Sequence, residues 1–383
     1  MAERSPDTVI IGGGAIGCAI AWELARRGAL VTVIERGTPG REATWAAGGM
    51  LSPLGESARD TAFLALATAS FDRYPAFIDA LADSTGQEVG YSTSGKFYVA
   101  FERTEEDVLD DLVKRGAAFQ AERLSGEEAR RREPSLSPKV RAAVFVGRDH
   151  RVDNRRFGAA LWSAAARTGV DFRLGASACE VLIDSDGGRN RARGVRLETG
   201  TSVPASAVVI AAGAWSGVIA GLLKPLPVRP VRGQMFAVSS HVSTEAETAP
   251  LLEHVIMTRD CYIIPRDNGP IVVGATVEEV GFTIGPTPRG ISGLLAAAVE
   301  AVPAIADLPL IETWAGFRPG SPDRLPILGP DPDVAGLFYA TGHYRNGILL
   351  TPVTAQVMAD VITGRRPTVD IERFGIGRFC EAP

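Results

Sequence analysis

The sequence has few of the residues that build metal centres or disulfide frameworks, and it has no basic excess. Its four cysteines and four histidines are scattered over 383 residues, with no Cys-x-x-Cys pair and no ligand-like histidine spacing. Forty basic against 45 acidic residues leave a net charge of −5, whereas a nucleic-acid-binding protein usually carries a basic patch or stripe. We therefore expect no protein metal site and no nucleic-acid partner.

Long apolar runs are also missing. No stretch approaches the 18 or more apolar residues of a membrane span, and Gly12 interrupts the N-terminal apolar run before it could form the core of a signal peptide. We expect a cytoplasmic protein without a membrane partner. The hydrophobic and charged fractions, 45% and 22%, are those of a globular protein, and the length predicts two structural units.

The strongest positive signal is a glycine-rich turn between a short strand and a helix. Residues 8–11 form a β-branched run typical of a buried parallel strand, and residues 18–25 have helical composition. Between them lie Gly12, Gly14 and Gly17. In a G-x-G-x-x-G pattern the first glycine allows a tight turn, the second lets the backbone approach a pyrophosphate, and the third lets helix and strand pack closely.

A second predicted strand, residues 30–34, ends at Glu35. Glu35 follows Gly17 by 18 residues, close to the spacing of the acid that accepts hydrogen bonds from a ribose. A carboxylate there would repel a 2′-phosphate, which disfavours NADP. Strand, turn, helix, strand and acid in this order predict a dinucleotide bound on a doubly wound α/β fold, although the fingerprint does not separate FAD from NAD.

Two further features favour FAD. Residues 36–50 form a long loop of small residues whose backbone amides could crowd a flat ring, although a surface loop would have the same composition. Residues 207–213 form a buried strand that ends in small residues and could close the same site. No second G-x-G-x-x-G occurs, so an enzyme holding both FAD and NAD is not expected.

Several longer segments together resemble the glycine oxidase/D-amino acid oxidase family of FAD-dependent amine oxidases, from residue 8 to about 363. The most specific are WAGFRPGSPD and GHYRNGILL. The matching segments are GGGAIGCAIAWELARRG, AAGGMLSP, VRPVRGQM (228–235), YIIPR (262–266), IVVGATVEEVGF (271–282), WAGFRPGSPDRLPILG (314–329) and ATGHYRNGILLTP (340–352).

The resemblance implies a discontinuous, Rossmann-like FAD-binding domain and a separate substrate domain. The FAD-binding domain would comprise residues 1–80, 150–225 and 320–383, and the substrate domain residues 81–149 and 226–319. Short strand-like segments separated by Gly, Pro and Asp turns in the substrate part indicate an antiparallel sheet.

The resemblance also implies an activity. A hydride would pass from the α-carbon of glycine, a small amine or a small D-amino acid to flavin N5. Water would hydrolyse the imine, and O2 would reoxidise the flavin to give H2O2. The family context is thiamine thiazole synthesis, and the family oligomer is a homotetramer. Two alternatives stay open: a D-amino acid dehydrogenase with a non-oxygen acceptor, and a non-catalytic flavin-binding subunit of a larger oxidase.

Three residues are the candidates for substrate binding and catalysis. Arg318 lies in an otherwise apolar segment, where a surface arginine is unexpected, and its guanidinium could bind a carboxylate through two parallel bonds. Family resemblance assigns Arg318 this role, Tyr262 the orientation of the substrate, and Arg345 a position beside substrate and flavin. The structural alternatives are an ion pair for Arg318, a buried sheet tyrosine, and a surface residue at a helix start.

A helix end would stabilise negative charge on the flavin. Thr351-Pro352 resembles an N-cap followed by a first-turn proline, although the helix could begin as early as Gly347. His343 is interpreted as part of the cofactor shell rather than a base. By resemblance the FAD-binding residues are Gly12, Gly14, Ala15, Ile16, Gly17, Glu35, Arg36, Ala43, Thr44, Gly48, Gly49, Met50, Val181, Gly213, His343, Tyr344, Arg345, Asn346, Gly347, Ile348 and Leu349.

The sequence departs from the family pattern at two places and lacks one feature of a related group. Asp260-Cys261 stands where a His and an apolar residue are expected, and Val277 where a Met is typical. Both are candidates for the pocket lining, which leaves the preference among glycine, sarcosine and small D-amino acids open. Related sarcosine oxidases attach flavin to a late cysteine. Because no cysteine lies between Cys261 and Cys380, we expect non-covalent FAD.

Overall fold

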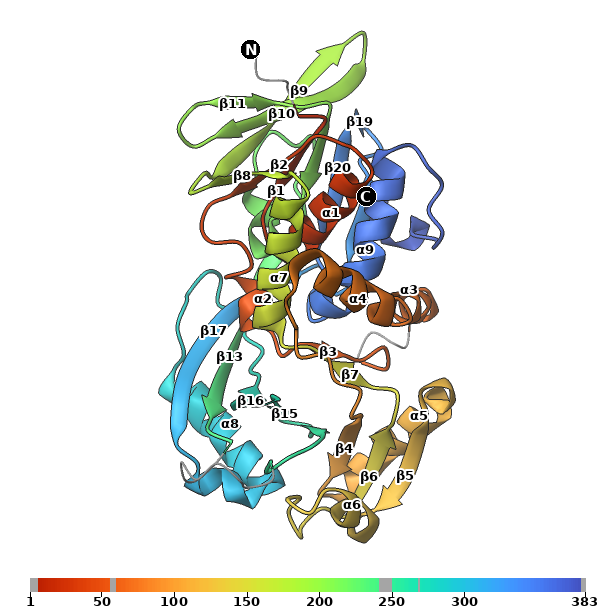
Figure 1. The fold of residues 1–383 in the computed structure, drawn as a ribbon, viewed down its shortest axis with the longest axis vertical. Coiled ribbons are helices and arrows are strands. Elements are labelled where there is room, and N and C mark those ends of the chain that lie inside the picture. Colours follow the sequence, from red (N-terminus) through yellow and green to blue (C-terminus); the bar gives the residue numbers. More distant parts are fainter. Residues whose placement is uncertain (1–5, 56–59, 241–249, 268, 380–383) are drawn as a thin grey trace.

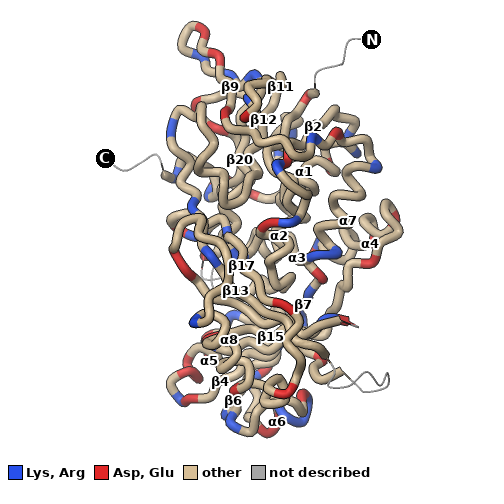
Figure 2. Tube along the Cα trace, turned by 90° about the vertical axis from the view of Figure 1, so that its left-hand side faces the viewer, with Lys and Arg blue, Asp and Glu red and all other residues tan. Residues whose placement is uncertain are grey.

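The computed structural model describes residues 6–55, 60–240, 250–267 and 269–379. Cys380 and His241 therefore lie outside the described residues. A mainly parallel sheet with its helices fills the upper half of the view in Figure 1, and a mainly antiparallel sheet fills the lower half. Acidic and basic residues are interspersed along the whole trace (Figure 2). None of the described helices is long and apolar enough to cross a membrane.

The upper sheet has six strands in the order β18-β20-β12-β1-β2-β8. All neighbours are parallel except the edge strand β18, which is antiparallel to β20. The strands are β1 (Thr8–Ile11), β2 (Val31–Glu35), β8 (Asp171–Leu174), β12 (Ala207–Ile210), β18 (Ile327–Pro330) and β20 (Leu337–Thr341). As the sequence indicated, the strand at 207–210 lies beside the first strand, with Thr8 opposite Ala207.

Both faces of this sheet are covered, which explains its continuous β-branched runs. Side chains alternate along β1: Ile10 joins the helical side of the core, and Val9 and Ile11 join the opposite side. Helices α1 (Ala15–Arg26), α7 (Asn154–Arg167) and α9 (Gly347–Ile362) pack together on the helical side. On the other side lie β9 (Ala178–Asp186), β10 (Arg189–Leu197), β11 (Ser202–Pro204) and β19 (Val334–Ala335).

The lower sheet has eight strands in the order β17-β13-β16-β15-β14-β4-β6-β5. All its pairs are antiparallel except β4 with β14. The strands are β4 (Lys96–Ala100), β5 (Ala121–Ser125), β6 (Ala142–Val146), β13 (Arg229–Val238), β14 (Val255–Met257), β15 (Tyr262–Pro265), β16 (Ile271–Gly274) and β17 (Leu310–Gly320). Helices α5 (Glu106–Arg115), α6 (Gly126–Arg132) and α8 (Pro288–Ala301) pack against it.

The predicted fold class, a doubly wound α/β unit with an antiparallel-sheet unit, is confirmed. Every strand of the upper sheet comes from the segments predicted for FAD binding, and every strand of the lower sheet comes from the rest, except that β17 ends one residue beyond it, at Gly320. The domain limits themselves stay a prediction. Between the sheets lie a short pair, β3 (Met50–Leu51) with β7 (His150–Arg151), and the helices α2 (Ala43–Ala46), α3 (Thr61–Phe71) and α4 (Tyr74–Thr85).

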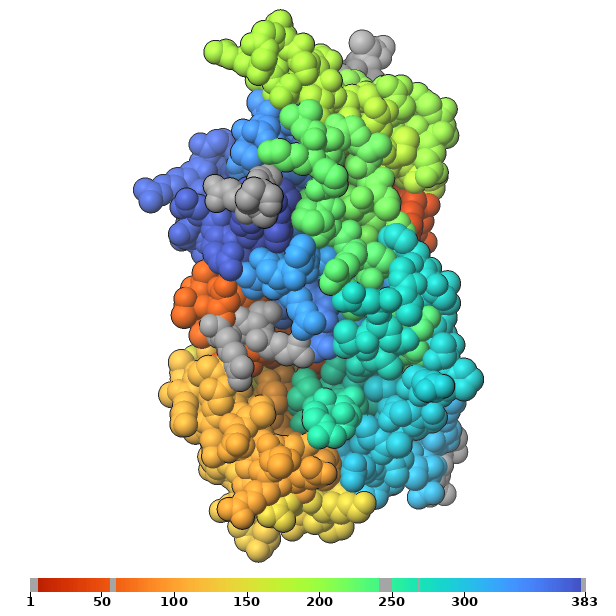
Figure 3. Space-filling model, turned by 180° about the vertical axis from the view of Figure 1, so that it is seen from behind, coloured from red at the N-terminus to blue at the C-terminus, as the bar shows by residue number. Residues whose placement is uncertain are grey.

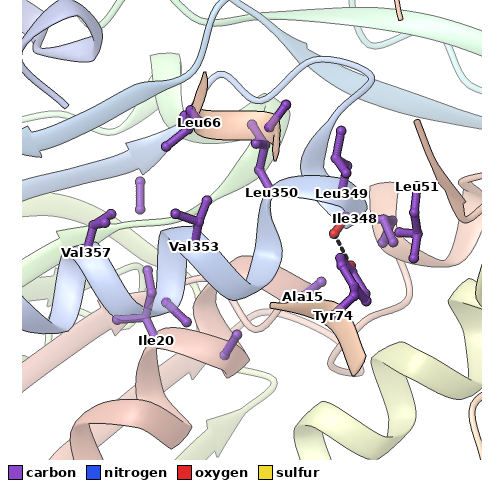
Figure 4. Close-up of a cluster of buried hydrophobic side chains, with 14 of the residues drawn as sticks. Ala15, Ile20, Leu51, Leu66, Tyr74, Ile348, Leu349, Leu350, Val353 and Val357 are labelled. Carbon is purple, nitrogen blue, oxygen red and sulfur yellow. Dashed lines mark hydrogen bonds between the residues drawn. The ribbon is translucent and has the colours of Figure 1, made fainter. Parts of the chain in front are cut away.

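Helix α9 begins at Gly347, so the N-cap prediction for Thr351-Pro352 is wrong and the earlier start is confirmed. Pro352 lies inside the helix, where a proline leaves the carbonyl four residues earlier without its helical donor. That carbonyl, on Ile348, instead accepts a hydrogen bond from the Tyr74 hydroxyl (Figure 4). The helix therefore continues through the proline because a side chain from α4 replaces the missing bond.

Ser70 stabilises the next residues of the same turn. Its hydroxyl donates to the carbonyl oxygen of Leu349 at 2.7 Å and accepts from the amide of Val353 at 3.3 Å. Ser70, on α3, and Tyr74, on α4, are both fully buried. These two side chains fix the first turn of α9 against the α3–α4 segment.

We expect Tyr74→Phe and Ser70→Ala each to lower the free energy of unfolding by about 1–3 kcal/mol, because each leaves a buried backbone group unsatisfied. Urea unfolding would measure the loss. Thr363→Ala is the control, since this exposed hydroxyl bonds to Ala359 at the other end of α9 and should change stability by only about 0.5 kcal/mol. Equal losses in all three variants would contradict the explanation.

Candidate active site

A cavity of about 910 Å³ lies where the two sheets meet. Its lining includes the ends of β1 and β2, the loop that follows β12 and the segment that leads into α9. From the lower sheet, β4, β13, β14, β15 and β17 contribute further lining residues. The parallel sheet and the antiparallel sheet thus share one cavity.

The glycine-rich turn forms the part of the cavity next to α1. A Cβ added to Gly17 would lie 1.9 Å from the carbonyl oxygen of Gly12, so only glycine allows this approach of helix to turn. Gly12 has φ +106°, a left-handed conformation that side chains other than hydrogen disfavour. The predicted roles of these two glycines as turn and packing residues agree with this geometry.

The first turn of α1 fits a phosphate-bearing cofactor. Gly14, its N-cap, has no side chain to bond the first amides, and the turn contains no acidic residue. The unpaired amides and positive dipole end of such a helix attract anions. Thr44 also lines this region, and its Oγ1 accepts from the amide of Ala15 at 3.0 Å, so the amides available to an anion are those that follow Ala15.

Glu35 lies at the end of β2, as predicted, and it lines the cavity. Its carboxylate accepts the amides of Gly13 and Gly37, each at 2.8 Å. These bonds fix the carboxylate beside the glycine-rich turn, where a ribose hydroxyl could donate to it. The position fits the predicted role of Glu35 as a ribose-binding carboxylate. Glu35 also stabilises the glycine-rich turn through these amides, a role that the sequence did not show.

The cofactor-binding predictions fall into two groups. All the predicted residues line the cavity except Gly17, whose role is the packing described above, and Val181. Val181 is buried in the core beneath the upper sheet, and its amide donates to the carbonyl of Ala220. Ala178 and Cys179, earlier on the same strand, line the cavity in its place.

A second uncapped helix end enters the same cavity. Asn346 precedes α9 but gives no side-chain cap, and the first turn has no acidic residue. Tyr344, just before it, has φ +49° and donates its amide to the carbonyl of Pro319 at 3.0 Å. A non-glycine residue in this left-handed region is held there by its surroundings. The loop therefore ties the start of α9 to the end of β17.

On the lower sheet, one face carries the substrate candidates. On β17, Gly316 is opposite Gly233 of β13, and Arg318, two residues further along the same face, is opposite Val231. The Arg318 guanidinium lies over Gly233, where an added Cβ would be 2.5 Å from its nitrogens. Its Nη1 donates to the carbonyls of Thr276 at 3.0 Å and Arg232 at 3.3 Å. Glycine at 233 is therefore what gives this guanidinium room.

Arg318 has no carboxylate within ion-pair distance among the described residues, so the ion-pair alternative is not supported. Burial lowers the pKa of Arg318, and Tyr262 opposes that shift. Arg345 lines the cavity too and is close enough to lower the pKa of Arg318. A cavity with two arginine side chains on its substrate-facing side can bind an anion such as a carboxylate.

Tyr262 lines the cavity beside Arg318, with its ring against Gly274. Its hydroxyl contacts the sulfur of Met235 at 3.7 Å. Burial raises the pKa of Tyr262, although Arg318 and Arg345 act against this. The phenol therefore keeps its proton and can donate a hydrogen bond. The sequence prediction brought Arg318, Tyr262 and Arg345 together, and the structure shows all three in the lining.

His343 lines the cavity, and its assignment to the cofactor shell stays a prediction. It is buried, and its Nε2 lies 3.2 Å from the hydroxyl of Thr354. Burial lowers its pKa to about 3.

The two departures from the family pattern do not line the cavity, so the expectation that they do is wrong. Asp260 lies in an exposed turn before β15 and pairs with Arg259, and Val277 is 46% exposed. Met257 and Thr258 line the cavity near this turn. Sequence reasoning missed these two residues, and it also missed Ser52, Lys96, Tyr98, Asp111 and Arg115. For Lys96 and Tyr98 the sequence offered only the strand-like composition of the substrate part, which indicated a sheet but not a cavity.

The fold and this cavity are those of an oxidoreductase: the glycine-rich turn of the parallel sheet fits a dinucleotide, and the arginine side chains beside the antiparallel sheet fit a small anion. Residues 7–361 match the model of the FAD dependent oxidoreductase family, DAO, and the chain belongs to that family. The prediction of FAD as the cofactor is thereby confirmed. Among the described residues, no three His, Cys, Asp or Glu side chains could hold a metal ion together.

Individual relatives are similar over the whole chain. The chain is 39% identical to the bifunctional protein ThiO/ThiG of Trichormus variabilis, with 97% of this chain and 55% of that protein covered. It is 36% identical to the glycine oxidase of Pseudomonas aeruginosa, with 97% of each covered. The chain thus spans about half the length of the bifunctional relative. The crystal structure of glycine oxidase from Geobacillus kaustophilus matches with a TM-score of 0.90 at 32% identity, covering 98% of this chain and 99% of that one.

The burial of His343 predicts a stability that depends on pH. Its pKa is about 3 in the native protein and about 6.5 when unfolded. Between these values only the unfolded chain binds the proton, so stability should fall as the pH drops below 6.5. In urea unfolding between pH 7.5 and 5, His343→Gln should reduce this slope by up to about 1.4 kcal/mol per pH unit.

Thr354→Val is the matched control. It removes the hydrogen bond to His343 but leaves the ring buried, so the slope should persist. Identical slopes in the unchanged protein and in His343→Gln would show that this histidine is protonated in the native state.

Proposed function

We propose that the protein oxidises glycine and similar small amines to an oxoacid, ammonia and H2O2. The glycine oxidase names of its relatives support this proposal. The observation that carries it is Arg318, a guanidinium with no carboxylate partner among the described residues, in the cavity that two uncapped helix ends also enter. An amino-acid carboxylate is the partner that this arrangement fits.

The proposed substrate is oriented by three groups. Arg318 binds the carboxylate, and two backbone carbonyls fix the direction of its guanidinium. The Tyr262 hydroxyl donates a hydrogen bond to the same carboxylate, and Arg345 adds positive charge beside it. When bound, FAD supplies the acceptor for the two electrons and the hydrogen of the α-carbon. The protein's contribution is orientation and electrostatics.

No side-chain base is needed in this proposal. The described lining residues of β13, β15, β17 and the start of α9 include no Asp or Glu. His343 is a poor candidate because burial lowers its pKa to about 3 and its Nε2 faces Thr354. We propose that the substrate binds with a neutral amine.

The uncapped N-terminal end of α9 is proposed to interact with the cofactor. Its first amides and positive dipole end lie in the cavity, where they would stabilise negative charge on the reduced cofactor. The end of α1 would bind the pyrophosphate. We propose that FAD is held in this way without a covalent bond.

We also propose a metabolic role and an oligomeric state. The ThiO/ThiG relative and the resemblance described above support a role in thiamine thiazole synthesis. Exposed apolar side chains support self-association into a homotetramer, and they gather at Val277, Val280, Phe282 and Ile284.

The first test is anaerobic bleaching of the flavin absorbance by glycine, sarcosine and D-alanine in turn, followed by air. We expect rapid bleaching by glycine, then return of the colour with formation of peroxide. Bleaching without reoxidation by air would instead identify a dehydrogenase with another acceptor. Absence of bleaching by all three would favour a flavin-binding subunit.

Arg318→Gln should raise KM for glycine roughly 10- to 150-fold, because a hydrogen bond to a charged group contributes about 1.5–3 kcal/mol. Steady-state peroxide formation would measure it. Arg259→Gln is the control, since that side chain is exposed in the turn before β15 and does not line the cavity. An unchanged KM in Arg318→Gln would rule out the carboxylate assignment.

A further inference from the structure

The substrate cavity continues across the lower sheet, beyond the residues that glycine needs. Tyr98 on β4 is opposite Met257 on β14, and Met257 is in turn opposite Tyr262 on β15. All three line the cavity, so this register forms one row of side chains on one face. Neighbouring strands lie roughly 4.8 Å apart, which places Tyr98 about 10 Å along the row from Tyr262.

A buried polar cluster supports the far end of this row. Lys96 is fully buried, and its Nζ lies 2.9 Å from Asp149 and 3.4 Å from the Tyr98 hydroxyl. Ser52 donates to Asp149 at 2.8 Å and accepts from Lys96. Burial lowers the pKa of Lys96, but Asp149 and Tyr98 more than offset this and raise it. Lys96 therefore stays charged, with its Nζ in contact with these three partners.

This cluster leaves the Tyr98 hydroxyl hydrogen free to bond elsewhere. Tyr98 accepts from Lys96, and no donated bond from Tyr98 occurs within the described part of the chain. Burial raises the pKa of Tyr98, so the phenol keeps its hydrogen. A donor is thus held rigidly at the cavity wall.

Arg115 on α5 adds a second donor at the same end. It lines the cavity, and its charge acts on Tyr98. Its Nη2 and Nε bond to Asp111, both at 3.1 Å, whereas its Nη1 is buried and has no partner among the described residues. A buried guanidinium nitrogen without an acceptor costs free energy, which a ligand oxygen at this position would recover.

The charge of the lining favours an anionic ligand. The lining contributed by β4, α5, β17 and the start of α9 contains four cations and one acid in the described residues: Lys96, Arg115, Arg318 and Arg345 against Asp111. Arg318 and Arg345 lie near Tyr262, and Lys96 and Arg115 lie near Tyr98. In Figure 3 the segments bearing β4 to β6 and β13 to β17 form the two lower flanks of the molecule.

We propose that Tyr98 and Arg115, supported by Lys96, form a second carboxylate subsite, so that the enzyme accepts N-substituted glycines and D-amino acids that carry a distal carboxylate. The inference rests on the proposed function, because the first carboxylate is taken to bind at Arg318. Glycine would leave the second subsite empty. A dicarboxylate would occupy both ends of the row.

The test compares substrates matched in size. N-(2-carboxyethyl)glycine is set against N-propylglycine, and iminodiacetate against N-ethylglycine, with kcat/KM measured from peroxide formation. We expect the unchanged enzyme to favour the carboxylate member of at least one pair by tenfold or more. Tyr98→Phe and Arg115→Gln should each reduce that preference about tenfold. Lys114→Gln, which removes a charge from an exposed position of α5 outside the cavity, should preserve it.

A binding measurement separates this inference from the proposed function. Glutarate and pentanoate differ only in the distal carboxylate, and their dissociation constants follow from the change they cause in the flavin absorbance. Tighter binding of glutarate, weakened in Tyr98→Phe or Arg115→Gln, would support the subsite even if no amine were oxidised. The subsite would be overturned if kcat/KM were equal for the two members of each substrate pair and the dissociation constants of glutarate and pentanoate were also equal. Oxidation of glycine in that case would leave the proposed function intact. If one variant lost its flavin, the test would rest on the ligand and substrate preferences of the unchanged enzyme and of the other variant.

Discussion

The nucleotide half of the molecule depends on one contact between backbones. Gly17 in the first turn of α1 lies against the carbonyl of Gly12, with no space for a side chain between them. An added Cβ on Gly12 itself would lie 2.5 Å from the carbonyl of Ala211. The turn, the helix and the end of β12 therefore meet at van der Waals distance. This contact places the first turn of α1 at the cavity and brings two distant parts of the chain together at the proposed phosphate site.

The substrate half uses charge in a complementary way. Arg318 is oriented by main-chain carbonyls and has no carboxylate partner in the described structure, while His343 is kept neutral by burial. The helix ends of α1 and α9 add positive potential without adding a titratable group. Positive charge in the cavity therefore changes little over the neutral pH range, because arginine and helix dipoles supply it.

Local patterns predicted the features whose causes are local. The glycines, Glu35 and the strand at 207–210 follow from spacing and composition, because turn geometry and burial act within a few residues. The start of α9 did not follow from Thr351-Pro352. Pro352 removes one helical hydrogen bond, and Tyr74, nearly 280 positions earlier in the chain, replaces it. The lining by Tyr98 and Arg115 was missed because it depends on pairing between strands and on helix packing, which composition does not encode. Family resemblance found Arg318, Tyr262 and Arg345, whose roles stay predictions.

The paired strands β13 and β17 extend from the lower sheet toward the upper one. They pair without interruption from Arg229 to Ala237 of β13, and at their upper end Gly320 forms a bridge with His343, just before α9. This long strand pair connects the lower sheet to the upper one along one side of the molecule. On the opposite side, the described strands between the two sheets are the short pair β3 and β7, each of two residues. Because this ladder joins the two sheets on one side, any displacement of β4, β6 and α5 relative to the upper sheet should be largest on the side away from β13 and β17.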